Sequence, residues 1–144
     1  MREILFRAKR KNWRELPKDE WWVEGYPVKY QPCASKDEYV YGIVPTYASA
    51  LYIIEIDPET LCQFTGKMDE DGEKIFDKDI VCFIDITSTE SGYSEHNCVG
   101  EVLWDEEECC FHVTDRLSAE SWEILNECRI LGNTFDNKEI LEEF

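Results

Sequence analysis

Short runs of apolar and β-branched residues, separated by polar turns, recur along the whole chain. Runs of about four to eight such residues are typical of β-strands with one or both faces buried. We therefore predict a mainly β fold with a minor α content. The expected strands are residues 4–8, 21–28, 39–45, 51–56, 80–84, 99–104, 110–113 and 128–132.

Polar and turn-forming residues set the expected breaks between these strands. Gly25 and Pro27 limit the second strand, and Pro58 ends the fourth, because proline cannot donate to a strand ladder. Asp69–Glu73 reads as a hairpin turn with Asp71-Gly72 at its tip. Residues 87–97 are polar and lack periodicity, which predicts a loop.

Two segments near the C-terminus have helical features. Residues 118–126 predict a brief helix with Trp122 and Leu125 on one side. Asp136 followed by Glu139 is typical of a capping box for a last helical turn. Elsewhere after residue 60 the strands are short and closely spaced, which favours a small barrel. We divide the chain into an N-terminal β region, residues 1–60, and a barrel region, residues 61–144, or one continuous fold.

The charge is distributed unevenly. Residues 1–18 hold seven basic residues and two acidic ones, a local charge of +5, which leaves −22 on the other 126 residues of a chain whose net charge is −17. This acidic body repels phosphate backbones. We therefore expect that the body does not bind duplex nucleic acid directly. Only the basic N-terminal segment is suited to contact nucleic acid.

The cysteines and the hydropathy pattern point to one compartment. The seven cysteines are odd in number and form no C-x-x-C pair, so a disulfide framework is not expected. The chain has neither a signal-peptide pattern nor a run of about 20 apolar residues that could span a membrane. We expect a cytoplasmic protein with no membrane contact.

Two groups of residues invite a metal-site interpretation. Asp69-x-Asp71-Gly72 resembles the middle of an EF-hand loop, but that register puts Lys67 and Lys78 where Ca²⁺ ligands belong. A second group comprises Cys98, Cys109, Cys110 and His112. Its adjacent cysteines should face opposite sides of a strand, and its spacing does not match a zinc site. We expect no metal and no cofactor, and we assign Cys82, Cys110 and Cys128 to core packing.

Catalytic chemistry has no recognisable motif in this sequence. His96 lies in the polar segment and His112 alternates with Phe111 and Val113, which is typical of an exposed or satisfied imidazole. We therefore name no catalytic residue and expect a protein that is not an enzyme. Neighbours on a strand face opposite sides, so one indole of Trp21-Trp22 should lie off the core. The candidate interaction surface comprises Trp21, Trp22, Arg2, Arg7 and Arg10.

Four segments in a fixed order carry a resemblance to a known family. They are residues 1–8 (MREILFRA), residues 59–81 (ETLCQFTGKMDEDGEKIFDKDIV), residues 130–135 (ILGNTF) and residues 139–141 (EIL). With these the chain resembles the YopX family of phage and prophage proteins. Cys62 departs from the family pattern, in which glycine is expected. The resemblance implies an SH3-like small barrel in the C-terminal part, a bacterial host cell, and no established biochemical function.

The charge asymmetry suggests two functions. A basic arm beside an acidic body favours a non-enzymatic protein-interaction module that binds a protein partner or forms a homo-oligomer. The alternative is an acidic decoy, similar to a DNA mimic, that occupies a host DNA-binding protein. Two parallel rows of acidic residues at duplex spacing would distinguish the decoy from the module.

Overall fold

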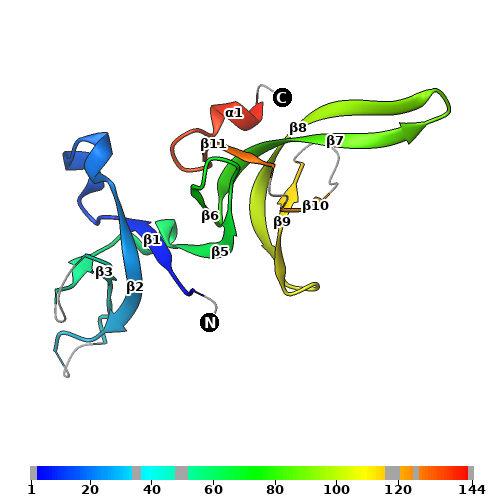
Figure 1. Ribbon diagram of the computed structural model, residues 1–144. Coiled ribbons are helices and arrows are strands. Elements are labelled where there is room, and N and C mark those ends of the chain that lie inside the picture. Colours follow the sequence, from blue (N-terminus) through cyan, green and yellow to red (C-terminus); the bar gives the residue numbers. More distant parts are fainter. Residues whose placement is uncertain (1–2, 34–36, 48–51, 116–120, 125–126, 143–144) are drawn as a thin grey trace. The chain divides into compact units, whose positions relative to one another are not determined.

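The chain forms two compact units, residues 1–64 and residues 65–144, both built mainly from antiparallel strands (Figure 1). The structure is a computed structural model, and it describes residues 3–33, 37–47, 52–115, 121–124 and 127–142. The prediction of a mainly β fold is confirmed. Within these ranges, no helix has the length and apolar character needed to cross a bilayer.

The first unit is a sheet in which β1 occupies an interior position. The strand order is β4-β3-β2-β1-β5, where β5 continues into the second unit and lies next to β6. The strands are β1 (Phe6–Lys9), β2 (Trp22–Tyr30), β3 (Val40–Pro45), β4 (Ile54–Glu55) and β5 (Cys62–Met68). Short 3₁₀ helices lie at Trp13–Glu15, Lys18–Glu20 and Pro58–Thr60. One hydrophobic cluster, Ala8, Val23, Ile43 and Ile56, forms the core of this unit.

Strand β2 contains Gly25 and Pro27 and ends at Tyr30, two residues beyond the predicted end at Val28. Thr46 N donates to Glu24 O, so the even-numbered residues of β2 exchange hydrogen bonds with β3. Pro27 therefore faces the other neighbour, β1, whose first residue pairs opposite Gly25. A proline there removes no ladder hydrogen bond, and the prediction that it limits the strand is wrong.

The second unit is an antiparallel sheet with the order β10-β9-β8-β7-β11. Its elements are β6 (Lys74–Phe76), β7 (Asp79–Thr89), β8 (Gly92–Asp105), β9 (Cys110–Thr114), β10 (Ser121–Glu123), β11 (Arg129–Asn133) and α1 (Glu139–Glu142). The core contains Ile75, Val81, Phe83, Val102, Val113, Ile124 and Cys128. The edge strands β10 and β11 are not neighbours, so the described strands form an open sheet, and a closed barrel is not observed.

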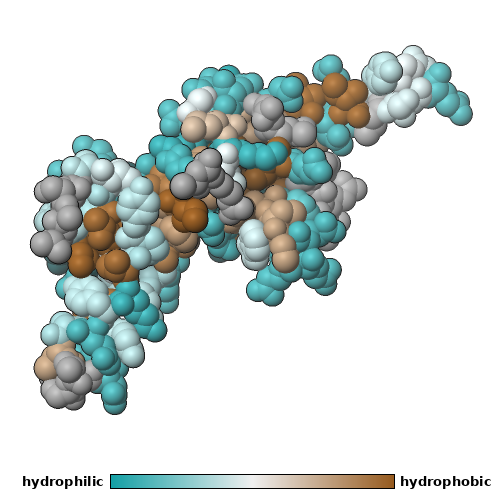
Figure 2. Space-filling view, turned by 60° about the horizontal axis from the view of Figure 1, so that its bottom comes forward, coloured by the Kyte–Doolittle hydropathy of each residue, from teal (hydrophilic) through white to brown (hydrophobic). Residues whose placement is uncertain are grey.

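The predicted loop at residues 87–97 is instead the tip of a long hairpin. β7 and β8 pair continuously from Ile80 opposite Glu101 to Thr89 opposite Gly92. Figure 1 shows this part of the hairpin as an arm, since β9 and β11 pair only with its base. The sequence prediction failed because both faces of the arm meet solvent, so polar residues replace the expected alternation. Figure 2 shows a hydrophobic patch on the arm, where Ile84 and Ile86 are exposed.

The helical predictions are corrected at the C-terminus. Residues 121–123 form strand β10, paired with β9, where a helix was expected; residues 118–120, 125 and 126 lie outside the described residues. The last turn is the helix α1, but it begins at Glu139 rather than at a cap on Asp136. Asp136 Oδ2 instead accepts a hydrogen bond from Asn133 Nδ2 at 3.2 Å.

Candidate functional site

Aromatic rings surround a buried lysine on one face of the first unit. Lys9 is 2% exposed, and its Nζ lies 3.9 Å from the ring centre of Trp13, 4.5 Å from that of Trp21 and 5.5 Å from that of Trp22. We call these three rings the tryptophan cage. An ammonium group over an indole face is attracted by the ring quadrupole, most strongly when it is removed from water. The cage therefore stabilises a cation inside the folded unit.

The local chain path builds the cage. Lys9 and Trp22 are opposite each other in the β1–β2 ladder, and the segment between these strands carries Trp13 and Trp21 over them. The rings of Trp13 and Trp21 pack edge to face at 4.9 Å. Trp21 Nε1 donates to Leu16 O at 2.9 Å, and Trp13 Nε1 donates to Asp57 Oδ2 at 3.4 Å. Each indole is thereby fixed by its polar atom as well as by packing.

The residues predicted as an interaction surface have different positions. Trp21 lies in a bend before β2 rather than on the strand, and both Trp21 and Trp22 are half-buried in the cage. Arg7 packs over Trp22, 4.8 Å from its ring centre. Arg10 lines a neighbouring cleft, and Arg2 lies outside the described residues. The basic side chains thus contact aromatic rings and carbonyl groups of their own unit.

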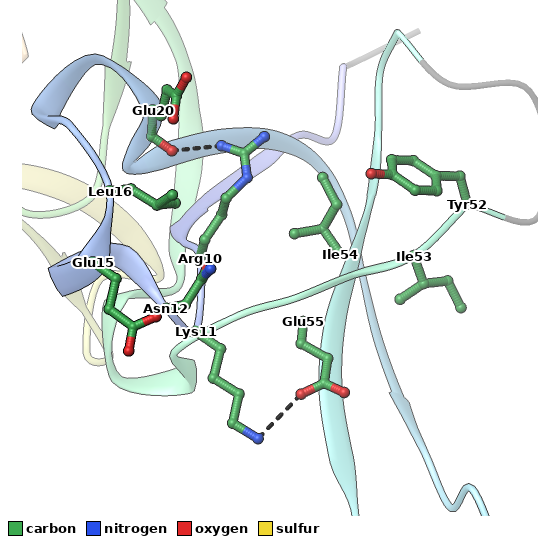
Figure 3. Close-up of a pocket in the computed structure, with 10 residues that line it drawn as sticks. All are labelled: Arg10, Lys11, Asn12, Glu15, Leu16, Glu20, Tyr52, Ile53, Ile54 and Glu55. Atoms are coloured by element: carbon green, nitrogen blue, oxygen red, sulfur yellow. Dashed lines mark hydrogen bonds and ion pairs between the residues drawn. The ribbon is translucent and has the colours of Figure 1, made fainter.

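A cleft beside β4 in the first unit has a volume of about 870 Å³. Figure 3 shows Leu16 and Ile54 on opposite sides of the Arg10 side chain. Arg10 Nη1 donates to Glu20 O at 2.6 Å, and Lys11 Nζ pairs with Glu55 Oε2 at 3.1 Å. The lining residues are Arg10, Lys11, Asn12, Glu15, Leu16, Glu20, Tyr52, Ile53, Ile54 and Glu55.

The backbone of residue 53 faces this cleft. Ile54 pairs with Ile43, and Ile56 N donates to Tyr41 O, so residues 54 and 56 bond to β3. Backbone groups alternate sides along a strand, so residues 53 and 55 face away from β3. Glu55 O accepts from Lys11 N at 3.0 Å, and an isolated bridge joins Arg10 to Ile56. Beyond that bridge the chains diverge, and the edge at Ile53 opens into the cleft.

The strand predicted at residues 51–56 is therefore much shorter in the structure. β4 contains only Ile54 and Glu55, and residue 51 lies outside the described residues. Tyr52 and Ile53 are 56% and 40% exposed although both are apolar or aromatic. Apolar periodicity could not identify the cleft. The position of the cleft depends on where the segment that follows β1 separates from β4, and this point leaves no pattern of apolar residues.

In the second unit, the acidic turn resembling an EF-hand is closed by its own backbone. Asp69 Oδ1 accepts from Asp71 N at 3.0 Å and from Glu73 N at 2.9 Å, while Asp69 Oδ2 accepts from Ile130 N at 3.2 Å. Burial alone would raise the pKa of Asp69, but these hydrogen bonds and the nearby Arg129 together hold that pKa below its ordinary value. The carboxylate thus links the turn to β11 by hydrogen bonds, and we call this link the Asp69 bracket.

The four residues that were considered as a metal group, and for which no metal was expected, are not all together in the structure. Cys98 lies opposite Phe83 in the hairpin, and Cys109 is exposed in the β8–β9 turn with a φ of 54°. Cys110 and His112 remain, on one face of β9. In the described part of the chain, no group of three or more His, Cys, Asp or Glu side chains is arranged to hold a metal ion.

The core-packing assignment of the cysteines holds in part. Cys128 is buried in the core of the second unit, whereas Cys82 and Cys110 are half-buried. Cys62, where glycine was expected from the family pattern, is buried. Burial raises the pKa of the Cys128 thiol to about 11, with a further contribution from Asp69. This thiol is therefore protonated at neutral pH and behaves as an apolar side chain.

Nearly the whole chain matches one protein family. The model of that family, described as YopX protein, matches residues 6–142. The chain belongs to the YopX family. The match includes the tryptophan cage, all described strands, and α1, so the YopX domain comprises both compact units. Comparison with curated proteins finds no match.

Proposed function

We propose that this YopX family protein is a protein-interaction module whose first unit binds an extended segment of another chain. The observation that carries the proposal is the edge at Ile53, whose backbone N–H and C=O face the cleft beside β4. An extended segment can add to such an edge as a further strand, with main-chain hydrogen bonds for affinity and side-chain pockets for specificity.

The surroundings of the edge suit a peptide. Leu16, Tyr52 and Ile54 offer apolar contacts, while Arg10 and Lys11 lie opposite the acidic residues of the same cleft. These mixed charges match a polar main chain better than a phosphate backbone. Aromatic side chains, which are enriched at protein interfaces, are exposed elsewhere on this unit at Tyr26, Tyr39, Tyr41 and Tyr47.

A backbone-specific pair of variants tests the proposal. The purified protein is used to select ligands from a displayed library of random peptides, and the selected peptides are measured against Ile53→Pro and Ile53→Ala. Proline removes the N–H that faces the cleft and leaves the bonds of β4 to β3 intact, whereas alanine keeps that N–H. We expect Ile53→Pro to weaken binding roughly tenfold or more relative to Ile53→Ala.

The outcomes separate the possible partners. Selected peptides that match segments of this chain would identify a second copy as the partner, which sedimentation would show as a homo-oligomer. Failure to select any peptide, or equal binding by both Ile53 variants, would refute the cleft as the binding site. Binding of a host DNA-binding protein that is displaced by duplex DNA would instead support the acidic-decoy function.

We also infer that the second unit is a variant of the SH3-like small barrel. Its strand order is a meander of β7, β8, β9 and β10, with the last strand β11 returning to the first. This order supports the relation even though the described sheet is open. No disulfide joins the seven cysteines, all of which are among the described residues, and this supports a reducing compartment such as the cytoplasm of a bacterial host, where phage and prophage proteins are made.

A further inference from the structure

The hairpin of β8 and β9 brings a thiol, an imidazole and a carboxylate together. Cys110 and His112 are separated by one residue on β9, so their side chains share a face of the sheet. Asp105 is opposite Cys110 in the β8–β9 ladder and therefore lies on the same face. Cys110 Sγ lies 3.1 Å from His112 Nε2, and His112 Nδ1 lies 3.3 Å from Asp105 Oδ2.

The arrangement defines the role of each imidazole nitrogen. The contact between Nδ1 and Asp105 is at ion-pair distance but outside hydrogen-bond geometry, so Asp105 acts through its charge. A carboxylate beside Nδ1 favours the tautomer with the proton on that nitrogen. Nε2 then keeps its lone pair directed at the Cys110 thiol. A nucleophile that contacts a base, which in turn contacts an orienting group, is the general pattern of nucleophilic catalysis.

The surroundings leave room for a small substrate beside the imidazole. A hollow of about 310 Å³ opens there, lined by Leu103, Thr114 and His112 among others. The side chain of His112 is 17% exposed and that of Asp105 is 35% exposed. This site is located wholly in the second unit and is independent of the cleft beside β4.

We propose that Cys110 is a nucleophile for acyl transfer, that His112 is its base, and that Asp105 positions His112. The acyl donor is an activated ester or thioester that is neutral or cationic. The Cys110 S–H proton passes to His112 Nε2 while Sγ forms a bond to the carbonyl carbon. The bond from that carbon to the leaving oxygen or sulfur breaks, and the leaving group takes the proton from His112 or departs as an anion.

Electrostatics explain both the need for a base and the choice of donor. Burial and then the charges of Glu108, Asp105, Cys109 and Glu123 raise the pKa of the Cys110 thiol. Little thiolate exists at neutral pH, so attack depends on proton transfer to His112 during the reaction. Glu108 lies in the turn, Asp105 on β8, and Glu123 opposite His112 on β10. This acidic rim repels anionic donors.

The probe is 4-nitrophenyl acetate, a neutral activated ester, with the full-length protein. Release of 4-nitrophenolate gives the rate, and mass spectrometry of digested protein locates the acetyl group. We expect acetylation of Cys110 faster than that of the exposed Cys109 or Cys33, with a rate that already rises at pH values below the range of an unassisted thiol. His112→Gln should lower this rate about a hundredfold.

Control variants separate chemistry from structure. Cys110→Ser should abolish the fast acetylation, and Cys33→Ser, at an exposed cysteine of the first unit, should leave it unchanged. Asp105→Asn should shift the pH at which the rate rises, which a purely structural effect would not do. A rate that rises only in the range of an unassisted thiol, or equal labelling of Cys109 and Cys110 in the unmodified protein, would overturn the proposal even if a variant failed to fold.

Discussion

At the scale of single residues, two buried charged side chains, Lys9 and Asp69, have dedicated partners. Lys9 has the tryptophan cage around its ammonium group, and Asp69 accepts hydrogen bonds from three backbone N–H groups. A buried charge without compensating partners is strongly unfavourable. The stability of the fold therefore depends on the groups that surround Lys9 and Asp69. Both are therefore points at which a small substitution should have a measurable effect.

Removal of one ring of the cage should destabilise the first unit. Trp13→Leu keeps an apolar side chain but removes the nearest ring face from Lys9, so the free energy of unfolding should fall by about 2 kcal/mol. Tyr39→Leu is the control, since Lys29 lies over that exposed ring at 4.4 Å. An exposed pair contributes less, and chemical denaturation of both variants makes the comparison. Equal losses would show that the buried cage adds nothing.

The Asp69 bracket predicts a pH dependence of stability. Because the pKa of Asp69 is lower in the folded protein, its stabilising contribution is complete above the ordinary value of 3.8 and is lost as the pH falls through the folded value. Urea unfolding at neutral and strongly acidic pH should show a smaller pH effect in Asp69→Asn than in the wild type. Asp71→Asn, an exposed neighbour, is the control and should leave the pH effect of the bracket in place.

At the scale of elements, β7 has two different environments along its length. Its first half is in the sheet between β8 and β11, while its second half belongs to the arm and pairs only with β8. Phe83 is buried in the core, and its neighbour Ile84 is 52% exposed on the other face. The same strand therefore changes from a core element to a solvated ribbon within a few residues.

This change gives a matched pair of substitutions. Phe83→Ala removes a buried ring and should lower the free energy of unfolding by about 2–5 kcal/mol, as should Ile80→Ala. Ile84→Ala is the control and should change it by less than about 0.5 kcal/mol. Equilibrium denaturation measures each value. Losses near the control value for both core variants would mean that β7 is not part of the core.

At the scale of the whole molecule, the basic N-terminal segment is part of a fold rather than a free arm. β1 lies between β2 and β5, and Leu5 is 1% exposed although Ile4 is 59% exposed. Among the described basic residues of this segment, Arg10 donates to a carbonyl group and Lys11 pairs with Glu55. The others, Arg7, Lys9, Arg14 and Lys18, lie over aromatic rings of the first unit. The acidic charge of the remaining chain then governs the long-range field of the protein.

Deletion of residues 2–10 tests this role. The deletion removes an interior strand, so we expect loss of the unfolding transition of the first unit or dissociation of an oligomer. Calorimetry measures the transition, and sedimentation measures the assembly state. A control with Arg7→Gln and Arg10→Gln keeps β1, and its smaller effect should shrink at high salt. A truncated protein with unchanged stability and assembly, but with weaker binding to DNA or RNA, would show that the segment is a nucleic-acid ligand.

Several strands with a buried face could be predicted from the sequence, whereas the solvated arm and the strands β5 and β6 were not among the predicted strands. The strands β2, β3, β7, β8 and β9 contain apolar runs whose residues lie in the two cores, so these runs indicate burial directly. The arm does not, because neither of its faces is covered. The pairing of Lys9 with three indoles also leaves no periodic signal, since lysine on a strand usually indicates solvent. The spacing of Cys110 and His112 was visible, but Asp105 joins them only through the β8–β9 register.

The sequence by itself determined the family and the mainly β class, because both depend on local motifs and on which residues avoid water. Only the tertiary structure decided which strands lie next to each other, where β4 stops, and which side chains meet across a ladder. The reason is physical: the cleft at Ile53 and the group of Asp105, Cys110 and His112 arise from strand register and chain divergence. Register depends on the packing of the whole sheet, and a local pattern of residues does not contain it.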